Sequence, residues 1–247
     1  MLQDHKDPVH WEKMVVSRVV PWEVAKLHAR PGEEEGIWPR MNVTLSRTHG
    51  AGGDHVAAEL GKLTGWPVYD RQLVDFIAEN AHVRDRVVAT LDERKLSETE
   101  NWFQTLFDPA ALATDKYLKH LLKVLSTLLA HGQAIVVGRG GHFVADPRHT
   151  VRVLVTAPLE WRLQQIMEKR GTDKKTAQKI VQEVDQSRAA FIKRYFHYDA
   201  GDSAVFDLVI NSERMAPGQA AAIILCALEQ RAGAPFARAA APEPQST

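Results

Sequence analysis

The chain has 247 residues, of which 45% are apolar and 25% charged, with 15 glycines and 12 prolines. These values are ordinary for a globular protein and exclude wholesale disorder, collagen and coiled coil, and the length suits one large domain or two small ones. The 31 Lys and Arg residues balance 31 Asp and Glu residues. Because a protein that holds nucleic acid through its phosphate backbone is normally basic, we predict no nucleic-acid partner.

The sequence carries no signal for export or membrane insertion. No apolar run reaches the about 18 residues that a membrane span needs, and residues 1–10 lack the apolar stretch of a secretory signal. The single cysteine, Cys226, cannot form an internal disulfide, which favours a reducing compartment. It lies in the apolar segment IILCAL, so we expect it in the core. We therefore expect a soluble cytoplasmic protein with no membrane partner.

Residues 1–40 differ in character from the rest of the chain. They contain four prolines, an acidic triplet at 33–35 and three of the 6 tryptophans, namely Trp11, Trp22 and Trp38. Disordered tails are poor in aromatic residues. We therefore predict an arm with a short helix near residues 23–29 that packs on the main domain or on a second subunit, forming a homodimer. A partly ordered leader with no role beyond packing is the alternative.

From residue 41 onward, short apolar runs alternate with helical patterns. The sequence predicts a strand at 41–46, a glycine-rich turn at 50–53, a helix at 55–65, a strand at 66–70 and a helix at 71–81. Residues 82–131 are mostly helical with a break at Pro109. Strands follow at 134–138, 151–157 and 206–212, and helices at 158–171, 172–196 and 217–232. The Ala- and Pro-rich tail at 233–247 is predicted to be disordered.

This succession predicts an α/β domain at 41–232 with a five-stranded, mainly parallel sheet flanked by helices. In such sheets, ligands bind at the carboxyl ends of the strands. The rule indicates four places: the turn after Ser46, the corner at Asp70 and Arg71, the corner at 138–141, and the segment before Phe206.

The strongest local signal is the strand, glycine-rich turn and helix in TLSRTHGAGGDHVAAEL. Glycine amides and a helix N-terminus together suit an anion such as phosphate. The match to the P-loop pattern, GxxxxGK followed by Ser or Thr, is poor. Alignment on Gly52 puts Arg47 at the first Gly, Gly53 at the Lys and Asp54 at the Ser or Thr. A tight turn that needs Gly for its backbone geometry, with Asp54 as a helix cap, is the alternative.

Four blocks occur in the same order as in a known family: SRTHGAGG, VYDRQLV, VVGRGG and DQSRAAFIKRYFHYDAGDSAVFDLVIN. Over residues 41–230 the chain resembles the cytidylate-kinase-like family, which is similar to the nucleoside monophosphate kinases. The resemblance implies a P-loop kinase fold with a helical lid, and a loop that holds the donor phosphates of ATP. The loop residues that it implies are Ser46, Arg47, Gly50, Ala51, Gly52, Gly53, Asp54 and His55.

The resemblance also implies roles around the acceptor. Arg47 supplies the cation of the missing P-loop Lys. Asp70 and Arg71 begin the acceptor-nucleotide site, and Arg139 reaches the acceptor phosphate as a catalytic residue. Asp54 departs from the family, which usually has a basic residue there. The negative charge of Asp54 beside the donor phosphates weakens their binding unless the Asp54 side chain turns away or binds Mg²⁺.

Residues 160–194 are basic, with nine Lys or Arg against five Asp or Glu. They suit a lid that stabilises charge on a transferring phosphoryl group. The resemblance implies that Asp185 binds substrate and that Arg188 and Arg194 are catalytic. On a continuous helix Arg188 and Arg194 lie about 240° apart, so both reach one ligand only if the helix breaks or curls. A solvated basic helix with an Asp185–Arg188 surface pair is the alternative.

The remaining polar residues indicate structure more than chemistry. The 11 histidines include no pair with the spacing of a metal site, and we predict no metal-binding side chains. We expect His49 to be a loop residue, His142 to line the acceptor side, and Asp202 to belong to a turn.

The implied activity is transfer of the γ-phosphoryl group of ATP to a nucleoside monophosphate, with CMP or dCMP first. Mg²⁺ bridges the donor phosphates largely through water, and positioning and charge stabilisation supply most of the catalysis. Two alternatives stay open. One is a nucleotide-binding regulatory module without kinase activity, which the missing Lys and the presence of Asp54 favour. The other is a kinase of another small acceptor.

Overall fold

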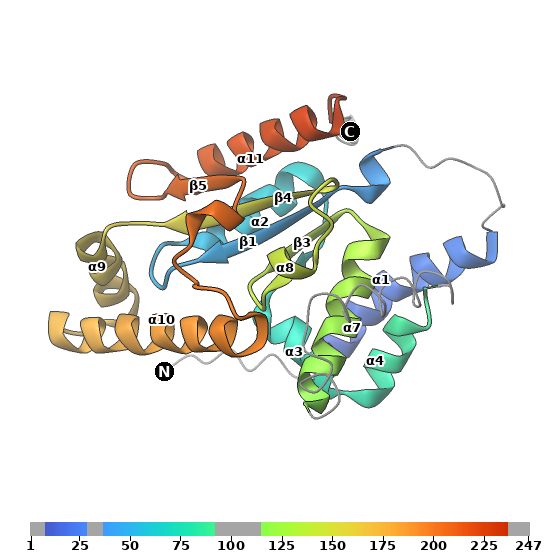
Figure 1. Ribbon diagram of the computed structural model, residues 1–247, viewed down its shortest axis with the longest axis horizontal. Coiled ribbons are helices and arrows are strands. Elements are labelled where there is room, and N and C mark those ends of the chain that lie inside the picture. The colour runs from blue at the N-terminus through green and yellow to red at the C-terminus, as the bar shows by residue number, and fades with distance from the viewer. Residues whose placement is uncertain (1–7, 29–36, 92–114, 237–247) are drawn as a thin grey trace, which may run out of the picture.

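A five-stranded parallel sheet lies at the centre of the molecule (Figure 1). The computed structural model describes residues 8–28, 37–91 and 115–236. The strands are β1 (Asn42–Arg47), β2 (Val68–Tyr69), β3 (Ala134–Val137), β4 (Thr150–Thr156) and β5 (Leu208–Asn211). They lie in the order β2-β3-β1-β4-β5, and every neighbouring pair is parallel. The predicted fold class and all five predicted strands are confirmed.

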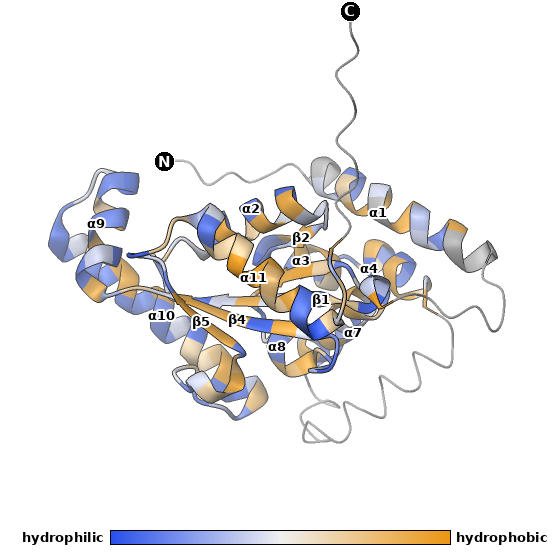
Figure 2. Cartoon of the chain, turned by 90° about the horizontal axis from the view of Figure 1, so that it is seen from above, coloured by the Kyte–Doolittle hydropathy of each residue, from blue (hydrophilic) through white to orange (hydrophobic). Residues whose placement is uncertain are grey.

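Helices cover both faces of the sheet, because its central strands are apolar on both sides. In β3, Ile135 and Val137 pack in one core with α2 (Gly53–Thr64) and α11 (Pro217–Ala232). Ala134 and Val136 pack in a second core with α7 (Lys116–His131). Successive side chains of a strand point to opposite faces, so one short strand contributes to two cores. In Figure 2 the strands are largely hydrophobic, whereas the peripheral α9 (Leu159–Arg170) is mainly hydrophilic.

The helices that follow β2 and β3 have other boundaries than those predicted from the sequence. α3 (Arg71–Glu79) ends at Asn80, whose side-chain oxygen accepts the Val83 N–H at 3.2 Å and thereby caps α4 (Ala81–Val88). A short helix that was not predicted, α8 (Gly141–Val144), follows β3. The predicted break at Pro109 lies outside the described residues. Within residues 8–28, 37–91 and 115–236, no helix has both the length and the apolar character of a membrane span.

The N-terminal segment contains a longer helix than predicted. α1 runs over Pro8–His28, with Pro21 inside it, instead of residues 23–29. Its buried or stacked side chains recur at helical spacing: Trp11, Val15, Val19 and Trp22. The Trp22 ring stacks on His131 of α7 at 4.0 Å between centroids, and Glu23 accepts two hydrogen bonds of 2.9 Å from Arg86 of α4. α1 thus completes the core formed with α3, α4 and α7.

The prediction that Cys226 lies in the core is wrong, because the residue is exposed. The buried face of α11 is formed by Ala220, Ala221, Ile224, Leu225 and Leu228. Cys226 lies two residues after Ile224, which places it on the other side of the helix. The apolar run IILCAL therefore has one buried side and one exposed side.

The first residues of the predicted disordered tail pack on the domain. The Phe236 ring meets Trp38 and Trp66 edge-on, at 5.0 and 6.0 Å between centroids. Trp38 precedes β1 in the short helix η1 (Trp38–Arg40) and donates through its ring nitrogen to the Pro235 carbonyl at 3.1 Å. Residues 237–247 lie outside the described residues.

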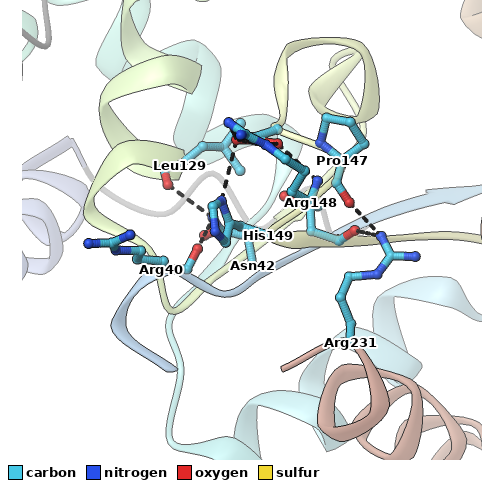
Figure 3. Close-up of polar contacts among 9 residues, drawn as sticks. Arg40, Asn42, Leu129, Pro147, Arg148, His149 and Arg231 are labelled. Atoms are coloured by element: carbon cyan, nitrogen blue, oxygen red, sulfur yellow. Dashed lines mark hydrogen bonds and ion pairs between the residues drawn. The ribbon is translucent and has the colours of Figure 1, made fainter. Parts of the chain in front are cut away.

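At the amino ends of the strands, side chains bond main-chain carbonyls and hold helices to the sheet (Figure 3). Asn42 Nδ2 donates to the carbonyls of Leu129 at 3.0 Å and Arg40 at 3.1 Å, which fixes the end of α7 against β1. Arg231 of α11 donates to the Pro147 carbonyl at 2.7 Å. Polar groups at this edge therefore serve the fold.

Candidate functional site

A cavity of about 330 Å³ opens at the carboxyl ends of the strands, where the α/β fold is expected to bind ligands. Its wall comes from the ends of β1 and β3, from α10 (Lys174–Phe196), and from residues 199–206 before β5. Its charged lining residues are Arg47, Arg71, Arg139, Arg188, Asp185 and Asp199. Four cations against two carboxylates make this cavity suitable for an anion.

The glycine-rich turn lies beside the cavity and not in its wall. Gly50 and Gly52 have φ angles of +83° and +70°, a backbone conformation that favours glycine. The cavity wall includes Ser46, Arg47 and Thr48 but not Gly50, Ala51, Gly52, Gly53, Asp54 or His55. Among the described residues, nothing accepts a hydrogen bond from the amides of Gly52, Gly53 and Asp54. These amides begin α2, so their N–H groups point away from the helix and suit an anion.

The Arg47 side chain lies across the turn. A Cβ added to Gly53 would lie 2.7 Å from Arg47 Cβ, and one added to Gly138 would lie 2.5 Å from Arg47 Nη1. The chain therefore needs glycine at both positions for Arg47 to pass between them. Arg47 Nε donates to Asp54 Oδ1 at 3.1 Å, and the Asp54 side chain is 71% exposed. Asp54, the predicted departure from the family, thus partly neutralises the cation predicted to replace Lys.

His142 is buried behind Ser46. Its Nδ1 lies 3.3 Å from Ser46 Oγ, and its ring lies 4.9 Å from that of Phe206. Burial, with the charge of Arg152 adding to it, lowers the pKa of His142 to about 3. The imidazole is therefore neutral near pH 7 and contributes no charge to the cavity.

Arg139 projects from the turn after β3 and is held by a residue that the sequence analysis missed. Its Nε donates to Asp75 Oδ1 at 2.6 Å, and its Nη2 donates to Asp75 Oδ2. Arg71 Nε lies 3.7 Å from the same Oδ2. Asp70 does not line the cavity, since its carboxylate accepts the Leu73 N–H at 2.9 Å and caps α3. The structure thus brings Arg71 and Arg139 together and leaves Asp70 outside.

Helix α10 is fastened to the turn after β1 through main-chain atoms. Asp185 accepts the His49 N–H at 2.7 Å and a hydrogen bond from Arg162 Nη1 at 2.6 Å. Arg188 Nη1 donates to the Arg47 carbonyl at 2.8 Å. Burial and the neighbouring charge of Arg47 lower the pKa of Arg188 to about 10. Asp185 therefore occupies one turn amide that an anion would otherwise use.

Arg194 does not line the cavity, and the helix has no break that would bring it to the same ligand as Arg188. α10 is continuous from Asp173, which caps it, to His197, which ends it at a φ of +60°. The interval contains neither Gly nor Pro, so nothing interrupts its hydrogen bonds. The Arg194 side chain is 71% exposed and lies 3.4 Å from Asp115. Arg188 lines the cavity and Arg194 faces away from it.

Three partners in the site were missed from the sequence: Asp75, Tyr117 and Arg162. Asp75 follows Arg71 by four residues in one helix, a spacing that indicates a pair. Tyr117 and Arg162 carry no such local signal. The turn predicted for Asp202 is present, since its carboxylate accepts the Ala204 N–H at 2.9 Å. In the part of the chain that the structure describes, no group of three or more His, Cys, Asp or Glu residues can hold a metal ion.

Comparison with known proteins shows which proteins this chain resembles. Residues 42–214 match the sequence profile of the cytidylate kinase-like family. The chain is 24% identical over 192 residues to a cytidylate kinase of Thermoplasma volcanium. The aligned region covers 77% of this chain and 92% of that protein. A cytidylate kinase of Thermoplasma acidophilum is 23% identical over 186 residues, with coverage of 74% and 90%. A crystal structure of an uncharacterized protein from Eubacterium ventriosum shares the fold, with a TM-score of 0.51 at 18% identity over 76% of this chain and 98% of that one.

Proposed function

Because the chain belongs to the cytidylate kinase-like family, we propose that it transfers the γ-phosphoryl group of ATP to a nucleoside monophosphate, with CMP or dCMP as the first acceptor. The observation that carries this proposal is the cavity with four arginines at the carboxyl ends of the strands. The names of the two Thermoplasma relatives support a cytidylate acceptor.

The arginines supply what phosphoryl transfer requires. The reaction spreads negative charge over the oxygens of the transferring group, and fixed cations in a site with little water stabilise that charge. Arg139 and Arg71 lie on the side of β2 and β3, where they would bind the acceptor phosphate. Arg188 is largely buried beside Arg47 and would contact the transferring group. No protein nucleophile is needed, because positioning and charge supply the acceleration.

The donor enters as the magnesium complex of ATP. The amides of Gly52, Gly53 and Asp54 at the start of α2 would hold donor phosphates, since a helix N-terminus favours anions. Mg²⁺ takes oxygen ligands and is usually held by one or two carboxylates together with substrate phosphates. The exposed Asp54 carboxylate fits that pattern and would contact the ion, with phosphates and water supplying its other ligands.

A second candidate is a nucleotide-binding module without kinase activity. Two contacts favour it: Arg47 is paired with Asp54, and the His49 amide is occupied by Asp185. Both contacts reduce the positive potential that the turn offers to a triphosphate.

Turnover separates the two candidates. The protein is incubated with ATP, Mg²⁺ and each of CMP, dCMP, UMP, AMP and GMP, and ADP release is followed. Release that depends on CMP or dCMP supports the kinase. Micromolar binding of ATP without turnover favours the binding module, and absence of nucleotide binding refutes both candidates.

The role of Arg47 as the replacement cation has its own test. Arg47→Ala is expected to weaken ATP binding by roughly 10- to 100-fold, since charge-assisted hydrogen bonds to phosphate are strong. Lys62→Ala is the matched control, because Lys62 lies in the last turn of α2, away from the cavity wall, pairs with Glu59 at 2.7 Å and is 71% exposed. Calorimetry measures both affinities. Equal effects of the two substitutions would mean that Arg47 is not the replacement.

A further inference from the structure

Asp75 gathers the polar groups at the acceptor side of the cavity. The residue lies on α3, and its side chain is 19% exposed. Oδ1 accepts from Arg139 Nε at 2.6 Å and from the Tyr117 hydroxyl at 2.9 Å. Oδ2 accepts from Arg139 Nη2 and lies 3.7 Å from Arg71 Nε. One carboxylate therefore connects α3, α7 and the turn after β3.

These contacts leave Arg139 with a single open edge. Asp75 takes the Nε edge of the guanidinium, and the centroids of the Tyr117 and Phe191 rings lie 6.0 and 4.9 Å from its central carbon. The backbone of Arg139 has a φ of +53°, between Gly138 and Gly140. Nη1 meets no acceptor among the described residues, and Arg139 forms part of the cavity wall. The open edge, formed by Nη1 and the second N–H of Nη2, can bind two phosphate oxygens side by side.

The charge balance also suits an anion. Asp75 offsets one of the two arginines that it contacts, so a net positive charge remains on this side of the cavity. Because its oxygens are occupied by Arg139 and Tyr117, the carboxylate presents no unpaired negative charge to a phosphate. Without Asp75, the long Arg139 side chain would lose the two hydrogen bonds that hold it in one rotamer. The side chain would then populate several rotamers, and the conformational entropy of these rotamers would have to be lost on binding phosphate.

We propose that Asp75 is a positioning residue for the acceptor phosphate, which it serves by fixing the guanidinium of Arg139 with its free edge toward the cavity. The inference rests on the proposed function, since it takes the acceptor to be a phosphate monoester. In this proposal Asp75 does not itself contact the substrate. Asp75 acts through Arg139, so its removal affects the phosphate part of the ligand and not the nucleoside part.

The test compares ligands with and without a phosphate. CMP and cytidine are titrated by calorimetry into the wild-type chain and Asp75→Asn. The expected result is that CMP binding weakens on the order of tenfold while cytidine binding changes by less than about twofold. In turnover assays the KM for CMP rises while the KM for ATP is maintained. Equal weakening of CMP and cytidine would reveal a merely structural role and would overturn the proposal.

A double-mutant cycle supplies a second readout. In an Arg139→Ala background, Asp75→Asn is expected to cause no further loss of CMP affinity, because Asp75 then has no guanidinium to fix. Additive losses would overturn the proposal. Tyr117→Phe is the matched control, since it removes one hydrogen bond to Asp75 and keeps the ion pair. Should Asp75→Asn fail to fold, Asp75→Glu keeps the charge but displaces the fork by one methylene, and the same selective loss for CMP is expected.

The outcomes also distinguish this inference from the proposed function. A wild-type chain that binds no nucleoside monophosphate would refute both. A wild-type chain that binds CMP, together with an Asp75→Asn variant that binds it equally well, would refute only the role of Asp75.

Discussion

Mild acid is expected to destabilise the fold through His142. The side chain is 7% exposed, and its ring lies 4.0 Å from that of Phe143 and 4.9 Å from that of Phe206. Chiefly through burial, its pKa falls from 6.5 to about 3 in the native protein. Protonation would place a positive charge in an apolar surrounding, near the cations that already line the cavity.

The sign and size of the effect follow from proton linkage. Below the unfolded-state pKa of 6.5, the unfolded chain binds a proton at His142 that the native chain does not bind. Stability from this residue is therefore fully present above that pKa and is lost as the pH falls toward the native pKa. Between about pH 7.5 and about pH 5, His142 alone removes about 2 kcal/mol of unfolding free energy. Burial also lowers the pKa of His49, to about 4, which adds a smaller loss of the same sign because His49 is only half-buried.

Urea denaturation at the two pH values measures the loss. His142→Phe keeps a ring of similar volume and cannot titrate, so the variant is expected to lose about 2 kcal/mol less than the wild type over this interval. His82→Gln, at an exposed position, is the matched control and should behave as the wild type does. An identical pH dependence in the wild type and His142→Phe would refute the assignment of a buried neutral imidazole.

Two further predictions concern backbone geometry and the lid. Gly140 has a φ of +70°, and a Cβ there would lie 2.2 Å from the ring of Phe196, so Gly140→Ala should lower the unfolding free energy by roughly 2–4 kcal/mol in urea denaturation. Gly218→Ala, where nothing lies within 4 Å, should not, and similar losses would contradict the steric explanation. Arg188→Ala should lower kcat on the order of 100-fold or more in the ADP-release assay, whereas Arg194→Ala should change it by less than about twofold because Arg194 faces away from the cavity. Comparable losses would mean that the lid rearranges during turnover.

Local patterns account for what the sequence analysis predicted correctly. The strands are short segments rich in apolar and β-branched residues between turn residues, and the burial of all four residues of β3 follows from its wholly apolar composition. The predicted helix at 172–196 is also a local pattern, and the structure begins it with a short-range cap, in which Asp173 accepts the Thr176 N–H at 2.7 Å. The turn containing Asp202 has the same origin.

The errors and omissions concern contacts between distant parts of the chain. The Arg139–Asp75 pair spans 64 residues and the bond from His49 to Asp185 spans 136, and no periodicity relates residues so far apart. Asp185 lines the cavity and also bonds the His49 amide and Arg162, contacts that no local pattern indicates, and its role in substrate binding stays a prediction. The error at Cys226 has a different cause, because a wholly apolar run does not reveal which side of a helix faces solvent.

The continuity of α10 has a thermodynamic consequence for the two substrates. Near its middle the helix holds the turn after β1 through Asp185 and Arg188, and one helical turn later Phe191 covers the guanidinium of Arg139. If a triphosphate displaced Asp185 from the His49 amide and α10 moved as one body, the ring that confines Arg139 would shift with it. Under the proposed function, such a movement would couple the two halves of the cavity, and by reciprocity each ligand would change the other's dissociation constant by the same factor.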